Sequence, residues 1–316
     1  MKPAEGLTMG VLPGCGNIRV NRKYLWRCSV INPSLVRAVE RLADLTQDVP
    51  DSDLDREWAW GAYESEGIRF AFFRTYEELR ELAVRTAAER AARGRTPSSA
   101  QRILYQYHTA YCDLEAALLG VQAGEANRTP GEGEWSLRQI AAHIVEAEVG
   151  FFGVVKYALD RHRSAGGRLA QIPDEEWEAI IGINEASLEK ILDGPLAGIR
   201  SYYEALHEQV LLEFAGISEG ELIVPSMYWE GYEMSLRFRL HRFDSHLRQH
   251  IVQVDKTLEG TGHSPNESKR LLRLIYSALG ETEGATIGAW EVTEELRRDA
   301  AETIAARAGA IAGILA

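Results

Sequence analysis

The chain has 316 residues, of which 45% are hydrophobic and 26% charged, a balance typical of a folded globular protein. Its formal net charge of −12 argues against general nucleic-acid binding, which needs a basic surface. No apolar run approaches the roughly 20 residues that a bilayer requires, so we expect no membrane partner. The three cysteines are widely spaced and form no CxxC pair, which makes a reducing cytoplasm the simplest expectation.

The N-terminal segment, residues 1–95, is expected to be a mostly helical extension packed on a larger bundle. Residues 1–33 are rich in glycine and turn formers, with at most a short strand or hairpin over 17–31. Asn32-Pro33 indicates a helix start, because proline is favoured at the first helical position. Helical periodicity returns over 68–93, and a polar linker, AARGRTPSS, then places a boundary near residue 95.

Four long helices are predicted in residues 96–262. The second begins at Ser136, where Gln139 three residues on completes a capping box. Gly194-Pro195 should kink or break the third helix. The fourth carries hydrophobic residues at steps of three and four, the spacing of a stripe that packs into a bundle. The predicted ranges are 97–120, opened by Thr96-Pro97, then 136–160, 186–215 and 234–259, and together they predict a four-helix bundle.

The C-terminal segment, residues 263–316, is expected to add helices that pack on this bundle. Ser264-Pro265-Asn266-Glu267 has the pattern of a capping box with proline at the first helical position. Gly280 is expected to close the helix that follows. The predicted fold class is therefore all-α: a four-helix bundle with additional N-terminal and C-terminal helical segments.

Two of the long helices carry histidines beside their apolar faces. His246 and His250 are four residues apart, so their imidazoles project from one face, one turn apart. His143 lies on the edge of the apolar face of the helix that begins at Ser136. Buried polar groups need partners, and a metal ion is a good partner for histidines on adjacent turns. The alternative is a structural or dimerising bundle with empty histidines, since isolated pairs of this spacing are often incidental.

The motifs around these histidines resemble the DinB/YfiT-like superfamily. WSLRQIAAHIVEAE at 135–148 is followed by HLRQHIVQ at 246–253, and the resemblance covers roughly 97–262. It implies a four-helix bundle whose three histidines, here His143, His246 and His250, meet at a divalent metal, often nickel or zinc. It also implies frequent homodimers and, for several members, thiol-dependent transferase activity. The flanking segments lie outside the resemblance, and it implies no function for them.

Three neutral imidazoles leave a metal with an open position for water or substrate. A water there would have its pKa lowered towards neutrality, and a thiol would be held as thiolate. We therefore expect a metal-dependent transferase or hydrolase that acts on a small molecule with a low-molecular-weight thiol or activated water. A metal-binding or ligand-binding bundle without turnover is the alternative.

Several neighbours of the histidines are candidate supporting groups. Gln253 lies one turn beyond His250 and could hold a ring nitrogen or a metal-bound water. Arg239 and Arg242 could bind a substrate carboxylate, or form salt bridges with acidic neighbours instead. Tyr228 and Trp229 could line the pocket mouth, and His207 is a rival metal ligand. We expect His241 at the surface, His108 in packing or capping, and Cys112 as a small buried hydrophobic residue. Glu148 is not expected to be a ligand.

Overall fold

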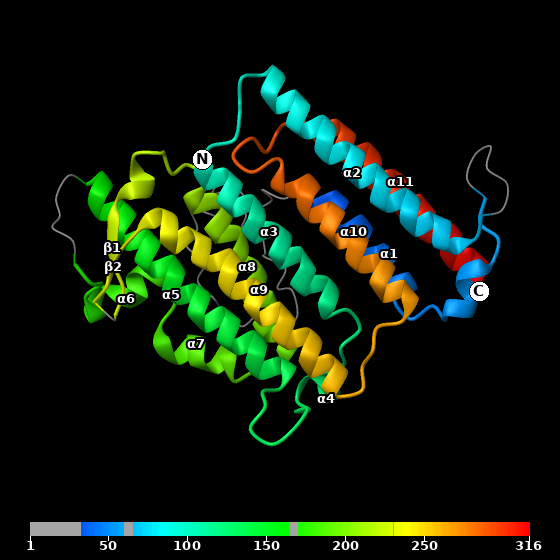
Figure 1. Ribbon diagram of the computed structural model, residues 1–316, viewed down its shortest axis with the longest axis horizontal. Helices are drawn as coiled ribbons and strands as arrows, with labels where there is room; N and C mark the ends of the chain where they lie inside the picture. The colour runs from blue at the N-terminus through cyan, green and yellow to red at the C-terminus, as the bar shows by residue number, and fades with distance from the viewer. Residues whose placement is uncertain (1–32, 60–65, 165–169, 230) are drawn as a thin grey trace, which may run out of the picture.

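The computed structural model describes residues 33–59, 66–164, 170–229 and 231–316 (Figure 1). The predicted strand or hairpin over 17–31 lies outside these described residues, as do Cys15 and Cys28. Helices make up nearly all of the regular structure in the described part, so the all-α fold class is confirmed. None of these helices combines the length and the apolar composition needed to cross a membrane.

The elements follow one another along the chain as a series of helices interrupted by one short hairpin. They are α1 (Pro33–Thr46), η1 (Asp51–Asp55), α2 (Ile68–Ala92), α3 (Ser99–Ala117), α4 (Ala123–Ala126), α5 (Leu137–Arg163), α6 (Asp174–Ile181), α7 (Glu185–Leu192), α8 (Leu196–Phe214), η2 (Glu221–Ile223), β1 (Pro225–Met227), β2 (Glu233–Ser235), α9 (Leu236–Gly260), α10 (Glu267–Gly284) and α11 (Glu294–Leu315). The two strands are antiparallel, with Ser226 opposite Met234.

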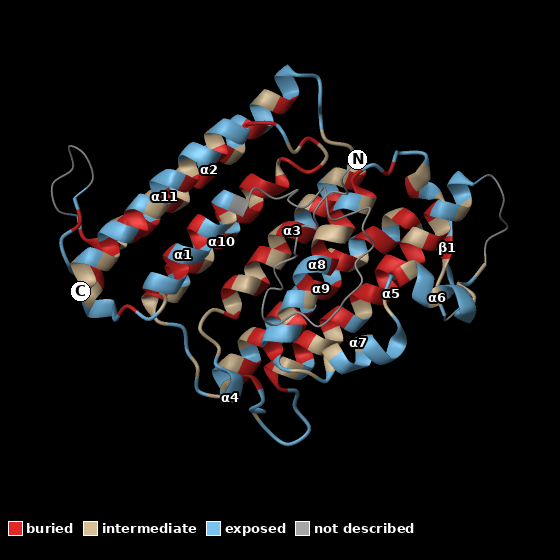
Figure 2. Cartoon of the chain, turned by 180° about the vertical axis from the view of Figure 1, so that it is seen from behind, coloured by how far each residue is buried: buried red, intermediate tan, exposed pale blue. Residues whose placement is uncertain are grey.

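Helices α3, α5, α8 and α9 form the predicted four-helix bundle. Each packs against two of the others, in the cyclic order α3, α9, α5, α8. Their apolar stripes meet in one core, in which Ile144, Val210, Phe243 and Leu247 are fully buried. Figure 2 shows the same arrangement, with the buried residues of these helices turned towards one another. Burial of each such side chain contributes about 1.5–3 kcal/mol, which makes this core the main stabilising feature of the bundle.

The predicted helix boundaries are confirmed at two places and shifted at a third. Ser136 caps α5 in a reciprocal capping box with Gln139. The break at Gly194-Pro195 is also confirmed, because α7 ends at Leu192 and α8 starts at Leu196. The prediction that Thr96-Pro97 opens α3 is wrong by two residues. Ser98 is the N-cap instead, since its hydroxyl accepts from the Gln101 backbone N–H while the Gln101 side chain accepts from the Ser98 N–H.

The two terminal segments build a second group of four helices beside the bundle (Figure 1). Helix α1 packs on α11, α11 on α2, α2 on α10 and α10 on α1. This group has its own hydrophobic core, with Leu35, Leu79, Ile275 and Ile304 fully buried. Helix α10 also packs along α3, so the two groups share one helix–helix interface. The division of the chain into three domains at residues 95 and 262 stays a prediction.

The start and the end predicted for α10 are both wrong. Asn266 is the N-cap, because its side chain accepts from the Lys269 N–H, so the helix starts at Glu267 rather than at Pro265. Gly280 does not terminate the helix, which continues to Gly284. A Cβ at Gly280 would lie 3.1 Å from the Thr109 Cα, so this glycine serves the close approach of α10 to α3.

A second close approach brings α6 onto the middle of α5. A Cβ at Gly153 would overlap the Trp177 ring, which lies against this glycine. We expect Gly153→Ala to lower the free energy of unfolding by about 1–3 kcal/mol, the usual cost of overpacking. The measurement is chemical unfolding followed by helical circular dichroism.

Gly309 of α11 is the matched control for this substitution, since a Cβ there would meet nothing within 4 Å. Gly309→Ala should stabilise the protein by about 0.5–1 kcal/mol, because alanine loses less backbone entropy on folding. Equal effects of the two substitutions would contradict the steric assignment at Gly153.

Candidate metal centre

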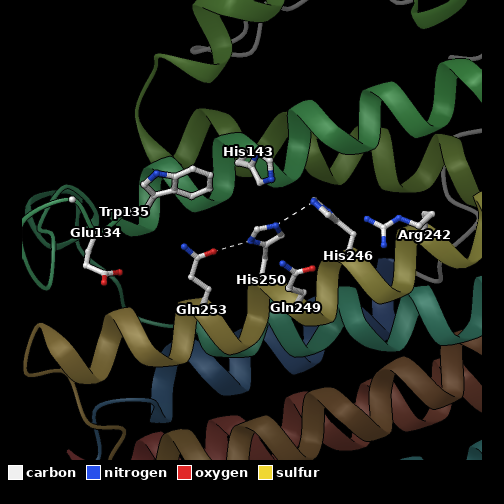
Figure 3. Close-up of a pocket in the computed structure, with 9 residues that line it drawn as sticks. Glu134, Trp135, His143, Arg242, His246, Gln249, His250 and Gln253 are labelled. Atoms are coloured by element: carbon white, nitrogen blue, oxygen red, sulfur yellow. Dashed lines mark hydrogen bonds between the residues drawn. The ribbon is translucent and has the colours of Figure 1, made fainter. Parts of the chain in front are cut away.

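Three histidines from two helices converge on one point at the edge of the bundle. His143 comes from α5, and His246 and His250 come from successive turns of α9 (Figure 3). One ligand nitrogen from each ring can be chosen so that all three lie within 4.8 Å of one another. Nε2 of His246 and Nε2 of His250 are 3.1 Å apart. The structure therefore brings together all three histidines for which metal binding was predicted.

A hydrogen bond from Gln253 determines which nitrogen of His250 faces the centre. The Gln253 Oε1 can only accept, so the Nδ1–H of His250 donates to it at 2.8 Å. The Nε2 of His250 then carries the lone pair and points at His246, as the dashed lines of Figure 3 show. Supporting hydrogen bonds of this kind commonly orient metal ligands, and this one agrees with the supporting role predicted for Gln253.

The spacing of these nitrogens fits a single metal ion. Histidine nitrogens bind zinc at about 2.0–2.1 Å, which places two ligands of one ion roughly 3 Å apart. The observed 3.1 Å between the His246 and His250 nitrogens agrees with this value. No fourth side chain of the metal-binding type joins the three histidines in the described part of the chain. A site with three protein ligands keeps a position open, as catalytic sites do.

The protonation states of the α9 histidines also suit metal binding. Burial lowers the pKa of His246 to about 3, and the neighbouring His250, His143 and Arg242 act in the same direction. Burial lowers the pKa of His250 as well, against the opposing effect of its hydrogen bond to Gln253. Both imidazoles are therefore neutral near pH 7, the form in which histidine coordinates metals.

Ring contacts hold His143, which is only half-buried. The indole of Trp135 packs edge-on against its imidazole, with 5.1 Å between ring centroids. The rings of His246 and His250 lie at 5.3 and 4.8 Å on its other sides. Trp135 was not predicted as a site residue. It immediately precedes Ser136, the N-cap of α5, and its side chain contacts His143, two turns further along the chain.

The histidines open into a pocket of about 450 Å³ on the surface of the bundle. Its lining comes from α5, α9 and the loop before α5: Gly133, Glu134, Trp135, His143, Arg242, His246, Gln249, His250 and Gln253. Glu134 and Gln249 were not predicted as site residues. Gln249 could have been found, because it lies four residues before Gln253 and seven after Arg242, on one face of α9.

The structure separates the residues predicted to bind substrate. Arg242 lines the pocket with its guanidinium 5.6 Å from the centre of the Phe151 ring. Arg239 is buried at the hairpin instead, where it donates to the Ser226 hydroxyl and the Tyr232 carbonyl, both at 3.2 Å. Substrate binding by either arginine stays a prediction.

The two aromatic residues expected at the pocket mouth also lie at the hairpin end of α5 and α9. Tyr228 packs beneath the Arg239 guanidinium, with 5.3 Å to the ring centre. Trp229 packs against Trp177 and Tyr228 while half of its surface stays exposed. Contact of these aromatic side chains with a substrate is likewise still a prediction.

The rival ligand His207 belongs to a different cluster inside the bundle. Its Nε2 lies 2.9 Å from Nδ1 of His108, and its ring stacks on Tyr111 with 3.9 Å between centroids. Cys112 is buried next to them, and burial raises the pKa of its thiol well above the usual value. His241 is exposed, as its helical angle indicated. None of these residues belongs to the three-histidine group.

Glu148 is fully buried and does not join the histidines. Its carboxyl group accepts hydrogen bonds from the hydroxyls of Tyr107 and Tyr203. Burial raises the pKa of Glu148 to about 8, although both hydrogen bonds act in the opposite direction. The side chain is thus a neutral acid near pH 7 within the bundle core.

The fold and this centre define a class: a helical bundle with three convergent histidines from its second and fourth long helices. The family model of the DinB superfamily matches residues 106–254. That range contains all three histidines and runs from within α3 to within α9. The bundle therefore belongs to the DinB superfamily, and the resemblance noted in the sequence is confirmed. No curated protein and no solved structure matches the chain.

Proposed function

We propose that the protein is a divalent-metal-dependent transferase or hydrolase that uses a small thiol or water at the three-histidine centre. The observation that carries the proposal is the convergence of His246 and His250, with Nε2 atoms 3.1 Å apart, beside His143. Zinc and nickel both suit a set of imidazole donors, and they are the metals that the family resemblance implies.

Each side chain around the centre would have a separate role. His143, His246 and His250 would hold the ion, which when bound lowers the pKa of a thiol or water so that either is nucleophilic near pH 7. Gln253 fixes the ring orientation of His250. Arg242 contributes a positive charge to the pocket, where it would orient an anionic group of the substrate. Trp135 covers one side of His143.

The pocket favours a reaction over a purely structural role for the metal. Structural metal sites have four protein ligands and are closed. Here three histidines face a pocket of about 450 Å³, which is large enough to admit a small molecule. The competing function is a bundle that binds metal or ligand without turnover and serves dimerisation. The exposed Trp229, Tyr232 and Phe238 near the hairpin are the surface that would suit contact between two copies.

The test compares metal-loaded and metal-free protein in conjugation of electrophiles with a panel of cellular thiols, and in hydrolysis of activated esters and amides. We expect loading with zinc or nickel to raise one of these rates at least about a hundredfold, as metal activation of a nucleophile does. Stoichiometric metal binding with no reaction would favour the non-catalytic bundle. Absence of metal binding would remove both functions.

A further inference from the structure

A second pocket lies between α1 and α11, in the group of helices outside the family match. Its volume is about 390 Å³, and three arginines line it: Arg37 and Arg41 from α1 and Arg298 from α11. Ala38 and Ala301 lie on the facing sides of the two helices and are buried, so small side chains leave room between the arginines. The pocket is independent of the histidine centre.

These three arginines form no ion pair with a described carboxylate, in contrast to two other arginines of α11. Arg297 and Arg307, also on α11, lie within 4 Å of Glu283 and Glu78, respectively. Throughout the part of the chain that the structure describes, no carboxylate comes within that distance of Arg37, Arg41 or Arg298. Exposed Arg85 of α2 also has no such partner among the described residues, so the distinguishing feature of the three arginines is that they line one pocket.

The placement of the three exposed arginines concentrates positive charge at one pocket. Arg37 and Arg41 are four residues apart on α1, so their charges repel one another on the same helix face. Arg298 adds a third positive charge from the facing helix. Burial and neighbouring carboxylates raise the pKa of Glu40, and the positive charge of Arg37 partly opposes this shift. Glu40 does not line the pocket.

The charges of the pocket match a dianion. Glu302 is the acidic residue of the lining, so three arginines and one carboxylate leave a net charge of two positive units. A phosphoryl group carries about two negative charges at neutral pH and presents oxygens in several directions. Guanidinium groups that approach from two helices can each donate a pair of hydrogen bonds to such oxygens. A planar carboxylate has only two oxygens and one charge.

We propose that this pocket binds a small molecule through a phosphoryl group held between Arg37, Arg41 and Arg298. The volume of about 390 Å³ leaves room beside a phosphoryl group, so the ligand that we propose is a phosphorylated small molecule rather than free phosphate. Because α1 and α11 lie near opposite ends of the chain, such a ligand would bridge the two terminal segments.

The experiment is titration calorimetry on the full-length protein at low ionic strength, with glycerol 3-phosphate, inorganic phosphate and succinate as probes. We expect glycerol 3-phosphate to bind one equivalent, and succinate to bind at least about tenfold more weakly because it lacks a tetrahedral dianion. Arg37→Ala, Arg41→Ala and Arg298→Ala should each weaken glycerol 3-phosphate binding about tenfold or more, the effect of losing one charge-assisted contact. Glu302→Gln should strengthen it.

Two exposed residues of α2 provide matched controls for the charge changes. Arg85→Ala and Glu81→Gln alter the net charge by the same amounts away from the pocket, and both should leave the affinity unchanged within about twofold. Equal losses in Arg85→Ala and Arg298→Ala would overturn the proposal, since binding would then follow net charge alone. Tighter binding of succinate than of glycerol 3-phosphate, or no binding of glycerol 3-phosphate, would also overturn it.

Discussion

Replacing His246 with alanine is expected to abolish stoichiometric metal uptake. His246 is one of the three candidate ligands, since its Nε2 lies 3.1 Å from that of His250 and its ring is 5.3 Å from that of His143. Two remaining histidines do not form a stable site for zinc or nickel, so bound metal should fall from about one equivalent to less than about a tenth. The measurement is elemental analysis after incubation with each metal and removal of the excess.

The exposed His241 on the same helix is the matched control. His241→Ala removes one imidazole from α9 but not from the centre, so uptake should stay at one equivalent. The helical circular dichroism of both variants should equal that of the parent protein, because the core of α9 is unchanged. Retention of stoichiometric metal by His246→Ala would show that the ligand assignment is wrong.

Ionisation of Glu148 is expected to lower the free energy of unfolding between about pH 5 and pH 8, so with rising pH this free energy should rise more steeply, or fall less steeply, in Glu148→Gln than in the parent protein. Burial raises the pKa of the Glu148 carboxyl group to about 8 in the folded protein, against 4.5 for a glutamate in water. Below pH 4.5 both the folded and the unfolded chain hold the proton. Between the two values only the folded chain holds it, so raising the pH favours unfolding.

The size of this effect follows from the difference between the two pKa values. Each unit corresponds to about 1.4 kcal/mol, so the contribution of Glu148 is on the order of 4 kcal/mol across this range. Glutamine is neutral at every pH and can still accept from the Tyr107 and Tyr203 hydroxyls through its carbonyl oxygen. The measurement is urea unfolding at pH 5, 6, 7 and 8.

Glu146 is two residues away on α5 and exposed, which makes Glu146→Gln the control. This variant should keep the pH dependence of the parent protein, because it leaves the buried carboxyl group of Glu148 in place. If Glu148→Gln shows the same slope as the parent protein, the source of the pH dependence is another group.

Much of the helical pattern could be predicted because its causes are local. The capping box of Ser136 with Gln139 and the break at Gly194-Pro195 depend on residues within one turn of each other, and both are confirmed. The helix boundaries predicted at Thr96-Pro97 and at Gly280 were wrong for two different reasons, a competing cap at one and a tertiary contact at the other. Ser98 forms a reciprocal cap that proline cannot form, and Gly280 continues a helix because α3 lies against it.

For the candidate site, too, some features followed from local spacing and others required the tertiary structure. The spacing of His246 and His250 already placed both imidazoles on one face of a helix, a property of any α-helix. The family resemblance, rather than spacing, supplied His143 as the third ligand. Arg242 lines the pocket, whereas Arg239 donates hydrogen bonds to Ser226 and Tyr232 at the hairpin. This difference depends on the hairpin, which no periodicity in the sequence predicted.

By itself, the sequence determined that this protein is helical, that a DinB-type bundle occupies its middle, and which three histidines were candidates for metal binding. Only the tertiary structure decided that Trp135 packs on His143, that the terminal segments share a second core, and that three unpaired arginines of α1 and α11 line one pocket. The reason is physical: helix formation, capping and facial spacing are set by residues within about four positions of one another. The meeting of side chains far apart in the chain depends on how whole helices pack, and that is settled by the sum of all buried contacts.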